Sequence, residues 1–173
     1  LYYGNDTPPP SGFLIALQDI NGDGQADVVA RFGDTLQQGS HGGTGIAIYK
    51  GPLYAEVNDR IVRYGLAKDG ILPTANPETV VSGLPLTGDH PMHPFAIDAN
   101  GNLFVDVATA TNSCQPQNRM PNVPGDKPCK ELETRGGIWR YDANKPGQVF
   151  SPKERYATGI RNADGIAIDS TGL

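Results

Sequence analysis

The chain has 173 residues and a formal net charge of −5, with 22 glycines, 15 prolines and 38% hydrophobic residues. This length suits one ordinary domain, and the glycine and proline content predicts many short strands joined by turns. The negative charge and the absence of a lysine and arginine cluster argue against a nucleic-acid surface. No apolar run approaches the roughly 18 residues of a membrane span. The opening LYYGNDTPPP has no signal-peptide pattern, so Leu1 is not expected to be the natural start.

The first predicted element is a hairpin of GFLIALQ at 12–18 and ADVVARF at 26–32, joined by DINGDGQ. Four side chains in and after this turn match the early ligands of an EF-hand calcium loop: Asp19, Asn21, Asp23 and Asp27. Ala30 stands where that loop needs a bidentate glutamate, and the flanks are strands. The sequence therefore favours a tight acidic turn, with a calcium site as the alternative reading.

Two further units of four strands follow in the chain, each with period-2 alternation of apolar residues. The second unit has strands at 46–49, 53–57, 60–66 and 78–84, and the third at 95–98, 103–107, 136–142 and 148–152. ANGN at 99–102 is a strong hairpin signal, because Asn and Gly tolerate positive φ. KERYATGIRNADG at 153–165 is expected to be a link, and IAIDSTG at 166–172 to open a fourth unit. Trp139 and Tyr141 are expected to pack between units.

The units repeat at a spacing typical of propeller blades. Ile46 and Phe95 are about 49 positions apart, and the next unit is displaced only by the insertion between Cys114 and Cys129. The sequence therefore predicts an all-β fold, part of a β-propeller with about three blades present. The expected divisions are the outer strands of one blade, a second blade, a third blade with the inserted loop, and the start of a fourth: 1–36, 37–86, 87–160 and 161–173. Since a ring needs roughly four to eight blades, the rest of the ring is expected in a longer protein.

Blade topology sorts the loops onto two faces. The loops between the second and third strands, and the links between blades, lie on one side, so all three histidines should share a rim with the cysteine loop and Arg161-Asn162. Long loops on a rigid scaffold are where sites usually lie. The functional face is expected to be this rim.

Three histidines are candidates on that rim. His90 immediately precedes an innermost strand, where it is either a general base or a ring that caps backbone groups. His93 is expected to be structural, and His41 is a substrate-rim candidate. The histidines lack any local metal-binding spacing, so no metal ligand is assigned.

The charged residues near the rim have two readings each. Arg161 offers a planar fork for a carboxylate and Asn162 offers a donor and an acceptor, which suits an acidic, carbonyl-rich ligand; the alternative is a rim salt bridge. Glu131, Glu133 and Arg135 either line a substrate pocket or form ion pairs that hold the cysteine loop.

Cys114 and Cys129 bracket a loop rich in proline, asparagine and glycine. A disulfide between them is favoured over two unrelated thiols, and loop entropy would make it worth about 3 kcal/mol. Such a bridge points to a periplasmic or secreted protein.

Three phrases together carry a family resemblance: GDHPMHPFAIDANGNLFVD, CKELETRGGIWRYDANK and YATGIRNADGIAID. In this order they resemble the glucose/sorbosone dehydrogenase family, six-bladed propeller quinoproteins that use pyrroloquinoline quinone (PQQ) and calcium. The resemblance implies that His90 is the general base and that Arg161 and Asn162 contact the quinone. It covers most of the chain from about Gly42 onward, but about half of a whole family member, so the calcium ligands are expected in the missing blades.

The sequence also departs from that family. The position corresponding to an aspartate that supports the histidine is near Thr109, which has no carboxylate; Thr109 and Arg135 remain substrate-rim candidates. The resemblance implies a PQQ-dependent oxidoreductase of carbohydrate metabolism that oxidises an aldose or a sorbosone-like aldehyde and passes electrons to an external acceptor. The 173 residues alone are expected to be inactive. The alternative is a non-catalytic β-propeller that binds carbohydrate or a protein partner through the same rim.

Overall fold

The structure, a computed structural model, describes residues 12–33, 42–68 and 70–169. In this part of the chain the regular structure is almost entirely β, which confirms the all-β part of the predicted fold class. The strands are β1 (Leu14–Gln18), β2 (Val28–Phe32), β3 (Gly42–Ile48), β4 (Leu53–Val57), β5 (Arg60–Tyr64), β6 (Glu78–Ser82), β7 (Phe95–Ile97), β8 (Asn102–Val107), β9 (Gly137–Asp142), β10 (Gln148–Val149) and β11 (Arg155–Thr158). The 3₁₀ turns η1 (Lys130–Glu133) and η2 (Pro152–Glu154) complete them.

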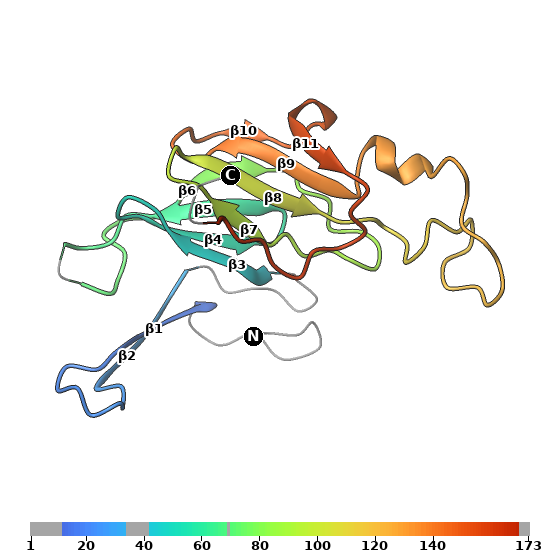
Figure 1. Cartoon of the computed structure of the whole chain (residues 1–173). Helices are drawn as coiled ribbons and strands as arrows, with labels where there is room; N and C mark the ends of the chain where they lie inside the picture. The colour runs from blue at the N-terminus through green and yellow to red at the C-terminus, as the bar shows by residue number, and fades with distance from the viewer. Residues whose placement is uncertain (1–11, 34–41, 69, 170–173) are drawn as a thin grey trace.

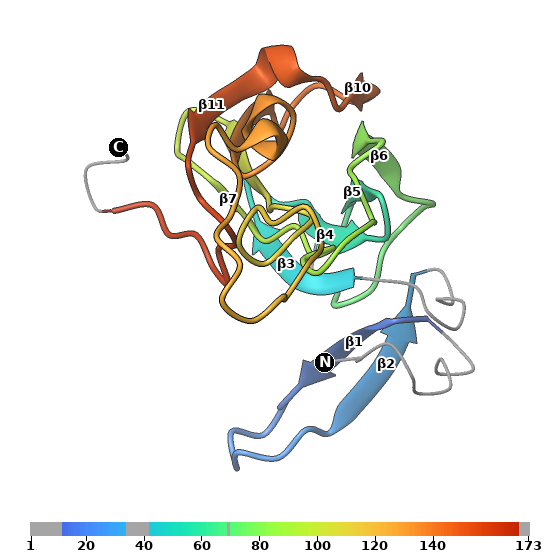
Figure 2. The ribbon, with the colours of Figure 1, turned by 90° about the vertical axis from the view of Figure 1, so that its right-hand side faces the viewer.

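The strands form three sheets. The hairpin β1–β2 stands alone, β3 to β6 form one antiparallel sheet in chain order, and β7, β8, β9 and β11 form another. We call the latter two the first and second large sheets. Figure 1 shows them stacked face to face, with the β1–β2 hairpin beyond β3, and Figure 2 shows the hairpin as a separate sheet. Phe32 of the hairpin packs against Tyr64 of the first large sheet, with ring centroids 5.4 Å apart. The two predicted four-strand units thus correspond to two antiparallel sheets, whereas membership of a closed ring stays a prediction.

The last strand of the second large sheet differs from the prediction. Residues 148–149 do not close their own sheet; they cross to the first large sheet as β10 and pair in parallel with β6. Phe150 contacts Trp139, with ring centroids 5.4 Å apart, and the Trp139 indole N–H donates to the Ser151 carbonyl at 2.8 Å. The outer strand is instead β11, within the segment expected to be a link. β11 has the sequence RYAT, and its large apolar residue, Tyr156, is 61% exposed. The sequence therefore has no apolar alternation here that would predict a strand.

Residues 166–169 were expected to open the next unit as a strand. They are described by the structure but are not in a sheet. A strand is defined by ladder hydrogen bonds to a neighbouring strand, and residues 166–169 take part in no ladder among the described strands. The start of a fourth unit at 161–173 therefore stays a prediction.

The main core lies between the two large sheets. Trp139 is fully buried and Tyr141 is 4% exposed, which confirms that they pack between units. Tyr54 of the first large sheet donates its hydroxyl to the Ala143 carbonyl at 3.0 Å. Large buried aromatic rings contribute much of the burial energy, so this layer holds the sheets together.

Local turn chemistry follows the sequence closely. In the predicted turn at 99–102, Gly101 has φ of 91°, and the Asp98 carboxylate accepts hydrogen bonds from the amides of Asn100 and Asn102. The Asn102 side chain adds a third bond at 2.7 Å. The hydrogen bond from that side chain, together with the turn amides, lowers the pKa of Asp98.

The acidic turn between β1 and β2 binds its own backbone. The Asp19 carboxylate accepts from the amides of Gly22 and Gly24 at 2.6 and 2.8 Å, and the Asp27 carboxylate from the amide of Ile20 at 2.8 Å. The amides of Gly24 and Gly22 lower the pKa of Asp19. Among the described residues, no group of three or more His, Cys, Asp or Glu side chains is placed to hold a metal ion. This geometry is that of the tight acidic turn.

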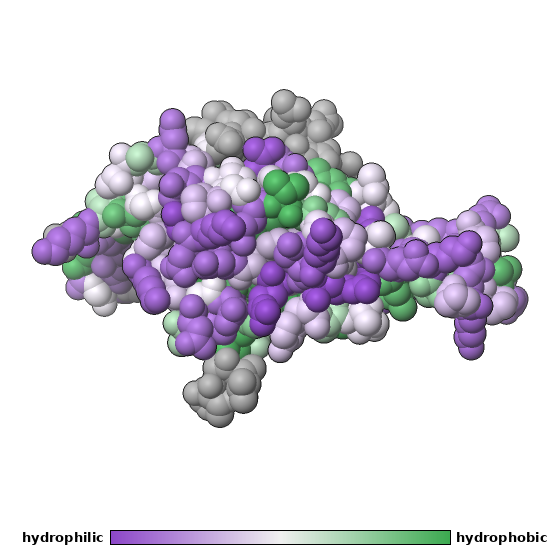
Figure 3. Space-filling view, turned by 90° about the horizontal axis from the view of Figure 1, so that it is seen from above, coloured by the Kyte–Doolittle hydropathy of each residue, from purple (hydrophilic) through white to green (hydrophobic). Residues whose placement is uncertain are grey.

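The outer surface is largely polar where the second large sheet ends. Figure 3, which views the molecule from above, shows mostly hydrophilic residues with small separate apolar areas. Exposed apolar side chains on other elements include Ile46 and Ile48 of β3, which are 61% and 68% exposed, and Leu17 of β1, which is 63% exposed. No helix in the described ranges has the length and hydrophobicity to cross a membrane.

Candidate functional site

An open groove of about 660 Å³ lies on the predicted rim. Three segments line it: the start of β3 at Gly43 and Thr44, the approach to β7 from Asp89 to Pro94, and 162–164 after β11. His90 and Asn162, which the sequence predicts on one rim, both line this groove. The topology thus brings together residues 72 positions apart in the chain.

The orientation of His90 is set by a backbone group. Its Nδ1 lies 3.0 Å from the carbonyl oxygen of Thr109. A carbonyl can only accept, so Nδ1 carries the hydrogen, and Nε2 of the neutral ring is the nitrogen that can accept a proton. The side chain lines the groove. The structure thus shows the backbone contact of the capping reading, and the role of His90 as a general base stays a prediction.

Thr109 lies behind His90 rather than in the groove. The residue is 6% exposed, its amide donates to the Arg161 carbonyl at 2.8 Å, and its hydroxyl donates to the Thr111 carbonyl at 2.7 Å. Its carbonyl thus meets the His90 ring at the position where a family aspartate was expected. A neutral carbonyl fixes the tautomer as a carboxylate would, but it gives less electrostatic support to a protonated ring.

Asp89 connects the groove to the cysteine loop. Its carboxylate forms an ion pair with Arg119 at 2.8 Å, and its amide donates to the Ala110 carbonyl at 2.8 Å. The hydrogen bond from Asn118, together with the Arg119 charge, holds the pKa of Asp89 below its ordinary value. The inserted loop therefore contacts one wall of the groove from behind, through Arg119.

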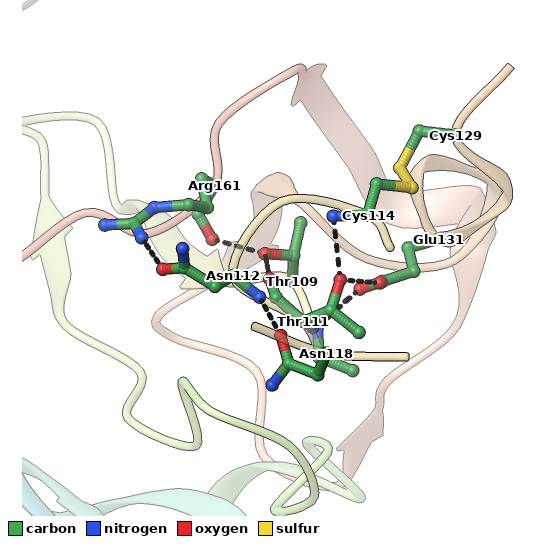
Figure 4. The surroundings of a disulfide bond; sticks show 9 residues. Thr109, Thr111, Asn112, Cys114, Asn118, Cys129, Glu131 and Arg161 are labelled. Atoms are coloured by element: carbon green, nitrogen blue, oxygen red, sulfur yellow. Dashed lines mark hydrogen bonds between the residues drawn. A yellow bond between two sulfur atoms is a disulfide. The ribbon is translucent and has the colours of Figure 1, made fainter. Parts of the chain in front are cut away.

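Arg161 does not line the groove that Asn162 lines. Its guanidinium donates to the Asn112 side-chain oxygen (Figure 4). It borders a separate hollow of about 250 Å³ that also contacts both cysteines. The two adjacent residues thus serve different surfaces in this conformation.

The cysteine loop is closed by the predicted disulfide. Cys114 and Cys129 are bonded, with Cα atoms 5.8 Å apart, which confirms the pairing. The Glu131 carboxylate accepts from the amides of Ala110 and Thr111 at 2.6 and 3.2 Å, and also from the Thr111 hydroxyl (Figure 4). Glu131 therefore holds the base of the loop through hydrogen bonds from Ala110 and Thr111, rather than through the ion pair of the second reading.

Arg135 and Glu133 lie outside the groove. Arg135 is 8% exposed, and its guanidinium donates to the carbonyls of Ala108 and Thr87 at 2.8 and 2.7 Å. Burial lowers the pKa of Arg135. Arg135 connects the end of the cysteine loop to Thr87, in the segment that precedes β7. Glu133 is exposed. His41 lies outside the described residues.

The disulfide gives a direct chemical prediction. The purified protein should gain about 2 Da on reduction, and alkylation should modify both cysteines only after reduction. Intact-mass spectrometry with and without reductant, on unfolded samples, makes the measurement. Two thiols that react before reduction would contradict the bridge.

Two buried carboxyl groups were not identified from the sequence. Glu56 of β4 and Asp106 of β8 are both fully buried. Each is the one acidic residue in a short, otherwise apolar strand, LYAEV or LFVDV. That isolated charge was the available signal, since acidic residues are almost never buried without partners.

Asp106 lies beneath the segment that forms one wall of the groove. One carboxyl oxygen accepts from the Ala163 amide at 3.3 Å, and the other has no hydrogen-bond partner within the described ranges. Burial, with a smaller contribution from the charge of Asp164, raises the pKa of Asp106 to about 7. The carboxyl group is therefore poorly solvated and favours its neutral form.

Comparison with known proteins gives the fold. No protein-family model and no curated protein matches the chain. Among solved structures, the chain is similar to a Carbohydrate-Active Enzymes family AA12 protein of Trichoderma reesei, with TM-score 0.53 and 19% identity over 79% of this chain. It is also similar to the PQQ domain of pyranose dehydrogenase from Coprinopsis cinerea, in its holo form, with TM-score 0.53 and 16% identity over 84% of this chain.

These similarities define an architecture. The chain covers 32% of the first neighbour and 36% of the second, and the first was also solved as a calcium structure. At this identity the likeness shows that the chain has the fold of part of such domains. The substrates and cofactors of these neighbours belong to those proteins.

Proposed function

We propose that the chain is part of a quinoprotein dehydrogenase that oxidises a sugar, with His90 as general base. The observation that carries this proposal is a histidine whose Nδ1 hydrogen is held by the Thr109 carbonyl, in the same groove as Asn162. The fold likeness to a PQQ domain and the family phrases around both residues support it. The disulfide supports a periplasmic or secreted location.

The donor groups at the groove suit a quinone. The Asn162 amide NH₂ can donate to a quinone carbonyl, and Arg161, one residue earlier, supplies a guanidinium for a carboxylate. Asn162 and Arg161 would hold pyrroloquinoline quinone, with Arg161 released from Asn112. When bound, this group would supply a two-electron acceptor for the oxidation of a sugar hydroxyl or aldehyde.

His90 would act on the substrate hydroxyl. Nε2 is the basic nitrogen of the neutral ring, and the Thr109 carbonyl keeps the Nδ1 hydrogen in place while Nε2 accepts the proton. The Asp89–Arg119 pair would hold the adjacent wall of the groove. The remaining blades of a six-bladed ring, and the calcium ligands, would belong to the parts of the proposed enzyme beyond this chain.

The proposal is tested with the full-length protein. Incubation with PQQ and calcium should give oxidation of an aldose or an aldehydic sugar, coupled to the reduction of a dye. The bleaching of the dye is measured and compared with a sample without PQQ. If calorimetry shows sugar binding but no PQQ-loaded sample shows turnover, the enzyme hypothesis is wrong and the alternative, a non-catalytic carbohydrate-binding protein, takes its place. A sample that binds neither PQQ nor sugar would refute both functions.

A further inference from the structure

A buried carboxylate joins the two large sheets beneath the groove. One Glu56 oxygen accepts from the Thr44 amide and hydroxyl at 3.2 and 2.6 Å and from the Gly45 amide at 3.2 Å. The other accepts from the His93 amide at 2.8 Å. Burial opposes the charge, but hydrogen bonds from His93 and Thr44 outweigh it and lower the pKa of Glu56. Glu56 is therefore a buried anion with donors from both sheets.

The sheets approach each other closely at this point. A Cβ atom on Gly45 would lie 2.3 Å from a ring carbon of Phe95 and 3.2 Å from the His93 carbonyl. The His93 ring is fully buried, and its Nδ1 lies 3.5 Å from Glu56. Neither ring nitrogen has a hydrogen-bond partner within the described residues. The backbone bond from the His93 amide to Glu56, with the contact of Nδ1 beside it, is thus the polar attachment of this residue to the first large sheet.

The segment from His90 to Pro94, which we call the strap, is stiff. Its sequence is HPMHP, so two residues have the fixed φ of proline, and each histidine before a proline is restricted to extended conformations. One end is held by the bond from His90 to Thr109 and the other by the bond from the Asp106 amide to the Pro94 carbonyl at 2.9 Å. A shift at His93 is therefore passed along the strap to His90.

From these contacts we infer that Glu56 is a positioning residue for His90. It fixes the strap against Thr44 on the opposite wall of the groove, so that the His90 ring stays within reach of the Thr109 carbonyl. The inference that this position of the His90 ring serves catalysis rests on the proposed function. The inference that Glu56 positions the ring is independent of the proposed function. Glu56 itself makes no contact with the groove, since it is fully buried.

The test uses Glu56→Gln in the full-length, cofactor-free protein labelled with ¹⁵N-histidine. The amide keeps the size of the side chain but places an NH₂ group where one carboxylate oxygen faces N–H donors, so one attachment is lost. Glu78→Gln is the matched control: Glu78, on β6 of the same sheet, is 59% exposed and pairs with Arg63 at 2.8 Å. Comparison with the spectrum of His90→Gln assigns the His90 resonances.

Imidazole ¹⁵N shifts distinguish the two neutral tautomers. The wild type and Glu78→Gln should show His90 with its hydrogen on Nδ1, whereas Glu56→Gln should show a mixture. In the sugar-oxidation assay, Glu56→Gln should lower kcat about tenfold or more, with KM nearly constant, as expected for a supporting partner of a catalytic group.

A folded Glu56→Gln protein with an unchanged His90 tautomer would overturn the inference. If that variant does not fold, Thr44→Val decides, because it removes only the 2.6 Å hydroxyl bond to Glu56. An unchanged His90 tautomer in folded Thr44→Val would then overturn it. If the tautomer changes as expected but the wild type oxidises no sugar, the proposed function fails and the positioning role stands.

Discussion

Replacing His90 by alanine should lower the rate of sugar oxidation by the reconstituted full-length protein by about 10²–10⁴-fold, the usual contribution of a general base. The loss is expected in kcat and kcat/KM together, because the ring would act on the proton that moves in the transition state. PQQ binding should remain, since the proposed quinone contacts are Arg161 and Asn162. Steady-state dye reduction and PQQ binding by calorimetry measure the two quantities.

A second substitution separates the base from the backbone contact. In His90→Gln the amide N–H can still donate to the Thr109 carbonyl, but the side chain cannot accept a proton at neutral pH. Both variants should therefore be equally slow, and added imidazole should partly restore His90→Ala. Turnover at the wild-type level in either variant would show that His90 only caps the backbone.

Replacing Asp106 by asparagine should stabilise the protein at neutral and higher pH. The folded state holds the Asp106 carboxyl with a pKa of about 7, against an ordinary value of 3.8. A raised pKa means that the folded state binds the proton more tightly than the unfolded state, so stability is lost as pH rises from about 4 to about 7. One pKa unit is worth about 1.4 kcal/mol, which sets an upper limit of about 4 kcal/mol and a realistic gain of about 2 kcal/mol.

The pH dependence of the stability gained by Asp106→Asn shows whether the gain comes from the titration of this carboxyl group. The difference in unfolding free energy between Asp106→Asn and the wild type should be smallest near pH 4, grow up to about pH 7 and stay constant above it. Denaturant unfolding at a series of pH values gives this profile. A loss of stability in Asp106→Asn at pH 8 would show that the carboxylate is favourably solvated in the folded state.

Asp98→Asn is the control with the opposite sign. The Asp98 carboxylate accepts bonds from the turn amides, and its pKa is lowered. A lowered pKa gives stability that is present above the ordinary pKa and is lost as the pH falls through the folded pKa. Asp98→Asn should therefore destabilise the protein at pH 7, with the effect fading below about pH 4.

Much of the chain could be predicted from local patterns. The β1–β2 hairpin, the four strands β3 to β6 and the turn at 99–102 follow from period-2 alternation and from turn residues, which act over a few positions. The bond between Cys114 and Cys129 follows from two cysteines at the ends of one loop. The placement of His90 and Asn162 on one rim needed only the order of strands and the rule that alternate connections lie on the same side.

Contacts between distant segments could not be predicted in this way. Residues 148–149 pair with β6 rather than with their own sheet, and alternation alone contains no information about which sheet receives a strand. The turn of Arg161 toward Asn112 depends likewise on a loop some 49 positions earlier.

The buried carboxyl groups show most clearly the difference between what local sequence patterns predict and what contacts between distant segments decide. The sequence by itself determined that Glu56 and Asp106 stand within apolar strands, but the partners that decide their charge come from elsewhere in the chain. Donors from β3 and from His93 outweigh the burial of Glu56 and lower its pKa. For Asp106, burial together with the charge of Asp164 outweighs the single hydrogen bond from the Ala163 amide and raises the pKa. Only the tertiary structure made that distinction, because the pKa of a buried carboxyl group depends on which donors and charges surround it.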